Sequence, residues 1–361
     1  MAASYREPSV DETLEHPAYG GAVWALEPHR QGKLAVARGR GGPMDVAWEI
    51  HGDGPVKIVL IMGLAGVMAS WQRQTLYFGH DRGERYSVLV LDNRGMGASD
   101  KPLMRYTTTD MARDVVEVLD HVGWTAPRAL NLVGISLGGM IAQELACAVP
   151  QRLQSLSLLC TSALLRDGRP PATELARRLA ALALNHEERA VADTARRIFG
   201  PDWRAAPDRD VLPLPAATPR CAPPPDGAAA YRRFDSNFQR FQAEELAKRR
   251  DGRSFTLRGY LCQMVAAHGH RKSDEQLRAM ADAVGRERIL VMHGSDDAVI
   301  AVKNGRRLVD AIEPADGLVV EGMGHAPVIE RAQWFNKLLE DRLETWAQLG
   351  PRASHGSVIK E

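Results

Sequence analysis

Short apolar runs recur along the chain, and turn-forming residues close each of them. They are rich in Val, Ile and Leu and occupy residues 57–62, 86–91, 129–133, 155–160, 289–292 and 317–320. Runs of this length and composition are typical of strands that are buried on both faces of a parallel sheet. Two earlier stretches, 33–38 and 44–51, flank a turn that contains Gly and Pro, and they predict a β-ribbon.

Helical patterns separate the apolar runs. They are expected at residues 109–121, 139–148, 302–312 and 332–349. Strands that alternate with helices of about 10–15 residues favour right-handed β-α-β units. The sequence therefore predicts an α/β fold with a doubly wound, mostly parallel sheet. In such a sheet the carboxyl ends of neighbouring strands meet at one edge, where ligands bind.

The alternation breaks between residues 162 and 273, after the sixth predicted strand. Helical patterns occur there at 173–184, 186–198, 243–250 and 255–267, without a convincing buried strand. Residues 201–227 are rich in Pro, Ala, Arg and Asp, and we expect an irregular loop. An all-helical insertion usually lies over the strand ends that bind ligands, so residues 162–273 are predicted to form a helical cap.

This insertion sets the expected organisation of the whole chain. Residues 31–161 and 274–349 would form the α/β core, and residues 1–30 an N-terminal extension with weak patterning. The polar end of the chain, 350–361, is expected to be disordered because it offers little apolar surface to bury.

Charge and composition exclude several classes of function. Lys and Arg number 46 against 45 Asp and Glu, a formal net charge of +1, so no overall field exists to hold nucleic acid or an anionic membrane. No stretch approaches the roughly 20 apolar residues that cross a bilayer, and the start lacks the apolar segment of a signal peptide. We expect a cytoplasmic protein without a nucleic-acid partner or stable membrane insertion.

The cysteines give no sign of a metal site. Cys147, Cys160, Cys221 and Cys262 lie far apart, and no Cys/His cluster has zinc-ligand spacing. No motif for a cofactor occurs either, so neither a metal nor a cofactor is expected.

The segment G-I-S-L-G at residues 134–138 matches the pattern G-x-S-x-G. It follows a predicted strand and precedes a helical pattern, so Ser136 is expected on a sharp turn that needs glycine on both sides. The turn would expose the hydroxyl and place it at the positive end of the helix. Ser136 is the candidate nucleophile, and the Leu137 amide that follows it is a candidate donor to an oxyanion.

A serine hydroxyl is a poor nucleophile unless a base removes its proton. His325 follows the last predicted strand on a glycine-containing loop, at the edge where such a sheet presents its active groups. We therefore choose His325 as the base over the other candidates, His268, His270 and His293.

An acid must hold the imidazole in the useful tautomer and offset the charge that it gains. The preceding strand ends in H-G-S-D-D, which offers two adjacent aspartates. We choose Asp297 and leave Asp296 as a turn-forming residue. The chain order Ser136, Asp297, His325 is the nucleophile–acid–base order of the α/β-hydrolases and not that of the two main serine protease folds.

Residues 46–348, apart from the insertion, resemble the α/β-hydrolase fold superfamily in its capped serine hydrolase branch. Four landmarks match in order: a loop M-G-L-A-G at 62–66, a D-x-R-G-x-G-x-S turn at 92–99, the elbow at Ser136, and the loops of Asp297 and His325. The resemblance implies that 62–66 is an oxyanion loop and that the Leu64 amide is the second donor. Met62 departs from the commonest pattern, a histidine, which concerns the support of the loop more than the chemistry.

Aromatic residues of the insertion are candidates for substrate contact. Phe234, Phe238 and Phe241 fall at helical spacing, which mostly indicates core packing. One or two of them, Phe234 and Phe238, are expected to face the pocket. Met68 and Trp71 follow the oxyanion loop and are expected to line its entrance.

A serine at the elbow implies acyl transfer. The predicted function is hydrolysis of a carboxylic ester, lactone or thioester of a small, moderately apolar molecule through an acyl-enzyme. Alternatives on the same triad are a carbon–carbon bond hydrolase, a perhydrolase, and an aminopeptidase in which Glu244 and Glu245 would hold the amine. An alternative of another class is a receptor-like protein that binds a ligand on a hydrolase scaffold.

Overall fold

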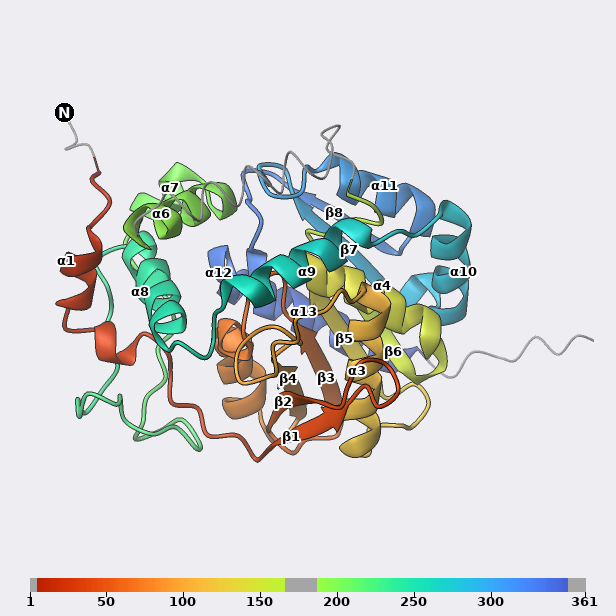
Figure 1. The fold of residues 1–361 in the computed structure, drawn as a ribbon, viewed down its shortest axis with the longest axis horizontal. Helices are drawn as coiled ribbons and strands as arrows, with labels where there is room; N and C mark the ends of the chain where they lie inside the picture. Colours follow the sequence, from red (N-terminus) through yellow and green to blue (C-terminus); the bar gives the residue numbers. More distant parts are fainter. Residues whose placement is uncertain (1–4, 166–186, 350–361) are drawn as a thin grey trace, which may run out of the picture.

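The computed structural model describes residues 5–165 and 187–349, and an eight-stranded sheet runs through its centre (Figure 1). The strand order is β1-β2-β4-β3-β5-β6-β7-β8. The strands are β1 (Arg30–Val36), β2 (Met44–His51), β3 (Val56–Ile61), β4 (Tyr86–Leu91), β5 (Leu130–Ile135), β6 (Leu153–Leu159), β7 (Ile289–Gly294) and β8 (Asp316–Val320). Pairs β1–β2 and β2–β4 are antiparallel and the others parallel, which confirms the predicted sheet.

The two faces of the sheet carry separate hydrophobic cores, because successive side chains of a strand point to opposite faces. Along β3, Val59 and Ile61 belong to one core. Ile58 and Leu60 belong to the other. All four side chains are fully buried. The central strands are therefore apolar on both faces, as their continuous apolar runs predict.

Helices cover both faces of the sheet. The first face packs against α3 (Thr108–His121), α4 (Leu137–Ala148), α10 (Asp274–Val284) and α11 (Lys303–Ile312). The second face packs against η2 (Met68–Trp71), η3 (Thr75–His80), α12 (Pro327–Glu330) and α13 (Ala332–Gln348). The short helix α2 (Gln72–Gln74) joins η2 to η3 and contacts α12 and α13. Two short turns, η4 (Pro150–Arg152) and η5 (Arg286–Arg288), precede β6 and β7. No helix within the described ranges has both the length and the apolar character needed to span a bilayer.

Between β6 and β7 the described part of the insertion is helical. It contains α6 (Glu187–Ile198), α7 (Pro201–Ala205), α8 (Asn237–Arg250) and α9 (Leu257–Gly269). Helix α8 begins six residues earlier than its pattern predicts, because the Ser236 side chain accepts a hydrogen bond from the Gln239 amide and caps it. The expected irregular loop at 201–227 opens with α7 and has no further helix. The predicted helix 173–184 and the predicted disordered tail lie outside the described residues.

The N-terminal extension packs against the insertion. Its helix α1 (Val10–Leu14) lies beside α8, and Figure 1 shows α1 grouped with α6, α7 and α8 at one side of the sheet. Val10 of the extension and Phe238 of α8 belong to the same hydrophobic cluster. The carboxylate of Glu7 pairs with Arg196 at 2.6 Å and with Arg204. The extension and the described insertion thus share one small core.

Candidate active site

Ser136 occupies the turn between β5 and α4 in a backbone conformation that L residues rarely adopt, with φ +56° and ψ −122°. The flanking glycines explain how the turn closes. A Cβ on Gly134 would lie 2.3 Å from the carbonyl oxygen of Gly138, and one on Gly138 would lie 2.0 Å from that of Ile61. Strain of this kind persists only where surrounding structure enforces it, and it is typical of functional sites. The elbow presents the partly exposed Ser136 side chain to a cavity.

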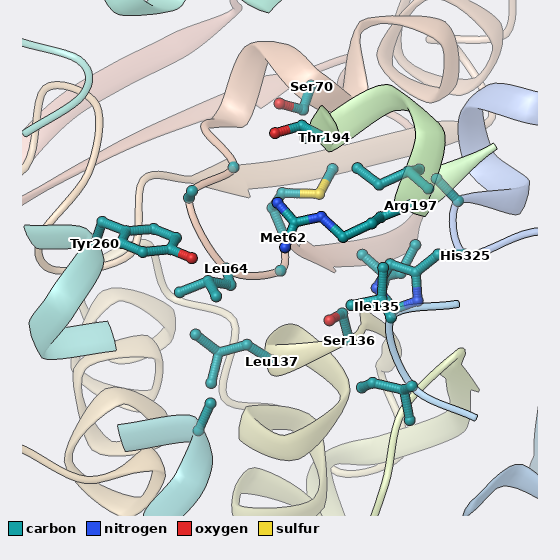
Figure 2. Close-up of a pocket in the computed structure, with 18 of the residues that line it drawn as sticks. Met62, Leu64, Ser70, Ile135, Ser136, Leu137, Thr194, Arg197, Tyr260 and His325 are labelled. Atoms are coloured by element: carbon teal, nitrogen blue, oxygen red, sulfur yellow. The ribbon is translucent and has the colours of Figure 1, made fainter. Parts of the chain in front are cut away.

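His325 and Asp297 approach this serine from the ends of two other strands. Asp297 follows β7 and His325 follows β8. The Nδ1 atom of His325 lies 2.7 Å from Oδ2 of Asp297. Because a carboxylate only accepts, Nδ1 carries the proton, and Nε2 of a neutral imidazole is left as the acceptor. Ser136, Asp297 and His325 all line the same cavity, and Figure 2 shows Ser136 and His325 next to each other there.

The Asp297 carboxylate is fully engaged. Its Oδ1 accepts hydrogen bonds from the amides of Val299 and Ile300, both at 2.8 Å. Its Oδ2 also lies 3.1 Å from Nε2 of the buried His293. Burial by itself would raise the pKa of Asp297, but His325 and His293 hold it well below its ordinary value. Asp297 is thus an anion fixed against the imidazole of His325.

The insertion helps to fix the His325 loop. The backbone amide of His325 donates to the carbonyl of Ile198, the last residue of α6, at 2.8 Å. A Cβ on Gly324 would lie 2.2 Å from that same oxygen, so glycine is needed for the close approach. The Gly324 amide donates to the carboxylate of Glu330 at 2.8 Å. The loop is therefore held from both the core and the insertion.

The cavity has a volume of about 790 Å³ and lies between the strand ends and the insertion (Figure 2). Its apolar lining includes Met62, Ile135, Met140, Phe241, Phe255, Met264, Val299, Val328 and Ile329. Charged side chains enter from the insertion, namely Asp193, Arg196, Arg197, Glu245, Lys248 and Arg249. Glu245 pairs with Lys248 and with Arg249, at 3.3 Å from the latter. The cavity therefore combines an apolar wall with a charged side that the insertion supplies.

The two predicted oxyanion donors face the same space. Leu64 and Leu137 both line the cavity near Ser136 (Figure 2). Neither of their backbone amides donates a hydrogen bond to another residue of the described ranges. A Cβ on Gly63 would lie 2.9 Å from Cβ of Ser136, so the loop runs directly against the elbow. Two open amides beside the hydroxyl can stabilise negative charge that develops there.

The four predicted substrate-contacting residues do not line this cavity, which corrects that expectation. Trp71 is fully buried in the core of the second face, together with Met68 at its margin. Phe234 precedes α8 and stacks on the ring of His16. Phe238 points into the core shared with the N-terminal extension. Helical spacing could not place Phe234 and Phe238, because α8 begins only at residue 237 and the N-terminal extension covers one face of this helix.

Sequence patterns also missed residues that do line the cavity from the insertion. Thr194 and Arg197 come from α6 and Tyr260 comes from α9 (Figure 2). His268 of α9 also lines the cavity. Both helices are predicted, so their presence was available from the sequence. The side that α9 turns toward the strand ends was not, because this helix shows little amphipathic contrast.

Among the described residues, one group of side chains has donor atoms close enough to hold a metal ion. It consists of Cys160, Asp297 and His325, whose donor atoms lie within 4.8 Å of one another. Burial raises the pKa of the Cys160 thiol well above its ordinary value, and a protonated thiol is a poor ligand. The other two members, Asp297 and His325, are hydrogen-bonded to each other. The group is therefore explained by this hydrogen-bonded pair and not by a metal ion.

Known proteins match the chain over different lengths. A bacterial protein of Azorhizobium caulinodans, provisionally named a carbamate hydrolase, is 34% identical over 119 residues, which cover 33% of this chain and 42% of that protein. The chain spans about two fifths of the length of the first curated relatives that it matches.

Solved structures match over most of the chain. A hydrolase of Pseudomonas aeruginosa aligns with a TM-score of 0.62 and 24% identity, covering 88% of this chain and 99% of that one. The enol-lactonase of Burkholderia xenovorans aligns with a TM-score of 0.60 and 23% identity, covering 87% and 100%. At these identities the likeness concerns the fold alone.

The sequence of residues 57–332 matches the family described as alpha/beta hydrolase fold. This match spans the oxyanion-like loop, the elbow of Ser136, and the loops of Asp297 and His325. The mostly parallel eight-stranded sheet agrees with it. The chain therefore belongs to the α/β hydrolase fold family.

Proposed function

We propose that the protein is a serine hydrolase that cleaves a carboxylic ester, or a related lactone or thioester, of a small, moderately apolar molecule. One observation carries the proposal. The strained elbow of Ser136 lines the same cavity as His325 and Asp297, and Nδ1 of His325 lies 2.7 Å from Oδ2 of Asp297. This combination supplies a nucleophile, a base and an orienting acid, which acyl transfer requires.

The reaction would proceed in two steps. In the first, Oγ of Ser136 attacks the substrate carbonyl carbon while Nε2 of His325 takes the hydroxyl proton. The carbonyl oxygen becomes an anion that the amides of Leu64 and Leu137 stabilise. His325 then protonates the leaving alcohol or thiol, and an acyl-enzyme remains. In the second step, His325 takes a proton from water, which attacks the acyl carbon. His325 then gives that proton to Oγ of Ser136 as the acyl–oxygen bond breaks, which releases the acid and the free serine.

The lining of the cavity supports a small substrate of mixed character. Side chains such as Met62, Met140 and Phe241 would contact an apolar portion, whereas the insertion would act as a cap that adds charged groups at the other side. The enol-lactonase among the structural neighbours bears the name of an enzyme that opens a cyclic ester. That name suits the proposed bond type without identifying the substrate.

The contacts of two glutamates disfavour an aminopeptidase. Glu244 is held by Arg73 at 2.8 Å. Glu245 lines the cavity but pairs with the cations Lys248 and Arg249. Neither carboxylate is left to bind a substrate ammonium group. The remaining alternatives are a carbon–carbon bond hydrolase, a perhydrolase and a receptor-like protein. Each would use the same cavity, and the experiments below distinguish them.

The first experiment labels the protein with a fluorophosphonate, which forms a stable adduct only with an activated serine. The wild type should take up the label, and Ser136→Ala should not. Ser70 also lines the cavity, so Ser70→Ala is the matched control and should still be labelled. An unlabelled wild type would overturn the proposal and favour a receptor-like role. Labelled Ser136→Ala would overturn it as well, because the activated serine would then be another residue.

A panel of p-nitrophenyl esters graded by acyl length then defines the acyl preference. Turnover that requires Ser136 and follows the acyl length supports ester cleavage. Turnover only with carbon–carbon substrates or with peroxide would assign one of the alternatives.

A further inference from the structure

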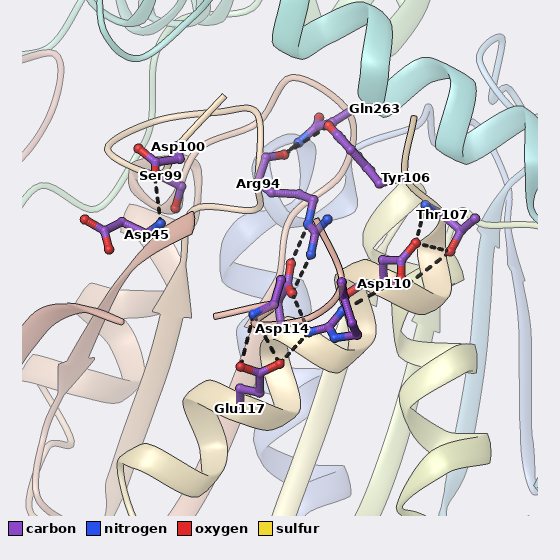
Figure 3. Close-up of polar contacts among 12 residues, drawn as sticks. Asp45, Arg94, Ser99, Asp100, Tyr106, Thr107, Asp110, Asp114, Glu117 and Gln263 are labelled. Carbon is purple, nitrogen blue, oxygen red and sulfur yellow. Dashed lines mark hydrogen bonds and ion pairs between the residues drawn. The ribbon is translucent and has the colours of Figure 1, made fainter. Parts of the chain in front are cut away.

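Gln263 connects the insertion to the loop beside the nucleophile. It lies on α9 and its side chain is fully buried. Its Oε1 accepts a hydrogen bond from the backbone amide of Ala65 at 3.1 Å. Its Nε2 donates to the backbone carbonyl of Arg94 at 3.0 Å, as Figure 3 shows. A neutral side chain that offers both a donor and an acceptor is needed here, and an amide provides this.

The residue that Gln263 holds is in an unusual conformation. Ala65 has φ +62°, in the left-handed region that residues other than glycine disfavour. The loop is tight, since the Gly66 amide donates to the carbonyl of Gly63 at 3.1 Å. Leu64, the proposed oxyanion donor, lies between these residues. A left-handed alanine persists only where its surroundings enforce it, and Gln263 supplies one of those contacts.

The D-x-R-G turn holds the two ends of the same loop from the core side. The Asn93 side-chain amide donates to the carbonyl of Met62 at 3.0 Å. The Asp92 carboxylate accepts from the amides of Met68 and Ala98, both at 2.7 Å. The core therefore fixes where the loop begins and ends, whereas the insertion contacts its middle.

Helix α9 is docked directly on this turn. A Cβ on Gly259 would lie 1.8 Å from the carbonyl oxygen of Gly95, so the two backbones touch. The Gly97 amide donates to the carbonyl of Ser254, just before α9, at 2.8 Å. Helix, turn and loop thus form one contiguous set of contacts, and a shift of α9 would be transmitted to Ala65.

We propose that Gln263 is a positioning residue, through which the helical insertion sets the direction of the oxyanion donor at Leu64. This inference rests on the proposed function, because it assigns a role within the same site. Gln263 does not line the cavity and touches no substrate. Its effect is to hold the loop so that the Leu64 amide is aimed at the charge that forms in the transition state.

The test replaces Gln263 by Met, which has a similar shape and lacks both hydrogen bonds. We expect kcat to fall roughly 10- to 100-fold with KM changed less than about twofold, since misplacement of a donor weakens only the transition state. Gln242 is the matched control, an equally buried glutamine of α8 that contacts the N-terminal extension instead. Gln242→Met should keep kcat.

A pair of ketones with the acyl chain of the best p-nitrophenyl ester separates positioning from general damage. A trifluoromethyl ketone accepts Oγ of Ser136 at its carbonyl carbon and forms an oxyanion, whereas the matching methyl ketone binds without reaction. In Gln263→Met the inhibition constant of the trifluoromethyl ketone should rise by the factor by which kcat falls, and methyl ketone binding should stay within about twofold. An unchanged kcat, or equal weakening of both ketones, would overturn the inference.

Gln263→Glu serves as the conservative variant. It keeps an oxygen for the Ala65 amide and should recover part of the kcat that Gln263→Met loses. If Gln263→Met does not fold, Gln263→Glu carries the test alone: kcat should fall and the trifluoromethyl ketone constant should rise by a common factor, and no change in either would refute the role. Labelled Ser136→Ala would defeat the proposed function itself. If Ser136→Ala takes up no fluorophosphonate and Gln263→Met keeps the wild-type kcat, only this inference is overturned and the proposed function stands.

Discussion

His325 and Asp297 come from the ends of two different strands, yet Nδ1 of the imidazole lies 2.7 Å from Oδ2 of the carboxylate. The neighbouring Asp296 is exposed, and its carboxylate accepts from the Ser295 hydroxyl at 2.7 Å. Two adjacent aspartates thus differ completely in surroundings. Only one of them can hold the imidazole in a fixed tautomer.

Exchange of each aspartate for asparagine should separate the two roles. Asp297→Asn should lower kcat by about 10⁴-fold, because the amide cannot support the tautomer that leaves Nε2 as the base. Asp296→Asn is the control and should remain near wild-type activity. Steady-state kinetics with a p-nitrophenyl ester measure both, and a larger loss at Asp296 would contradict the assignment.

Docking of α9 on the D-x-R-G turn can be tested with two glycines of the same helix. A Cβ on Gly259 would meet the Gly95 carbonyl oxygen at 1.8 Å, whereas one on Gly269 would meet no atom within 4 Å. Gly259→Ala should lower the free energy of unfolding by about 1–3 kcal/mol, because the backbone must move apart. Gly269→Ala should leave it unchanged or raise it by up to about 1 kcal/mol. Urea unfolding measures both, and equal stabilities would argue against the docking contact.

The buried pair of Arg94 and Asp114 supports the same turn (Figure 3). Nε of Arg94 lies 2.5 Å from Oδ2 of Asp114, and the two side chains are 1% and 3% exposed. Arg94→Met should destabilise the fold by about 3–5 kcal/mol, because it leaves a buried carboxylate with fewer partners. Arg40, 3.2 Å from Asp114, remains to offset part of that charge, which favours the lower end of the range.

An exposed ion pair provides the comparison for Arg94. Arg85 and Glu344 are 2.8 Å apart with side chains 48% and 45% exposed. Arg85→Met should change the free energy of unfolding by less than about 1 kcal/mol, since solvent screens the pair. Similar losses at both arginines, measured by denaturant titration, would show that burial does not control the effect.

His80 should make stability depend on pH. Burial lowers the pKa of its imidazole from 6.5 to about 4, and Nδ1 donates to the Pro219 carbonyl at 2.7 Å. Between pH 6.5 and 4 the unfolded chain therefore binds more protons than the folded one, so stability falls as the pH falls through this window. His80→Gln lacks this titration, and its free energy of unfolding should fall less steeply over the same range.

Urea titrations at steps from pH 7 to pH 4 would measure the two slopes. His121 is an exposed histidine of α3, so His121→Gln is the control and should keep the wild-type slope. Parallel curves for the wild type and His80→Gln would contradict the role of His80.

Much of the fold follows from local patterns. The run at 86–91 coincides with β4, and the pattern at 332–349 ends one residue beyond α13. Both elements follow from hydrophobic periodicity and turn residues, which are visible within a short stretch of sequence. The start of α8 was less clear, because a serine cap at residue 236 extends a helix that its apolar pattern alone does not reach.

Side-chain direction within the insertion could not be predicted in the same way. Phe238 and Phe241 lie on one helix, yet the first packs toward the N-terminal extension and the second also lines the cavity. Which of them meets a ligand depends on what covers each face of α8. The covering segment begins more than 200 residues earlier in the chain, where no local pattern reveals the contact.

The sheet, its helices and three candidate chemical groups can be predicted from the amino-acid order, because periodicity and turn motifs are properties of neighbouring residues. The side chains that enclose the cavity and the support of the loop at Leu64 depend on how distant segments pack together. Gln263 illustrates the reason, since its two backbone partners, at Ala65 and Arg94, are 198 and 169 residues away. A buried amide is bonded by whatever the fold brings to it, and such partners become visible only when the chain is folded.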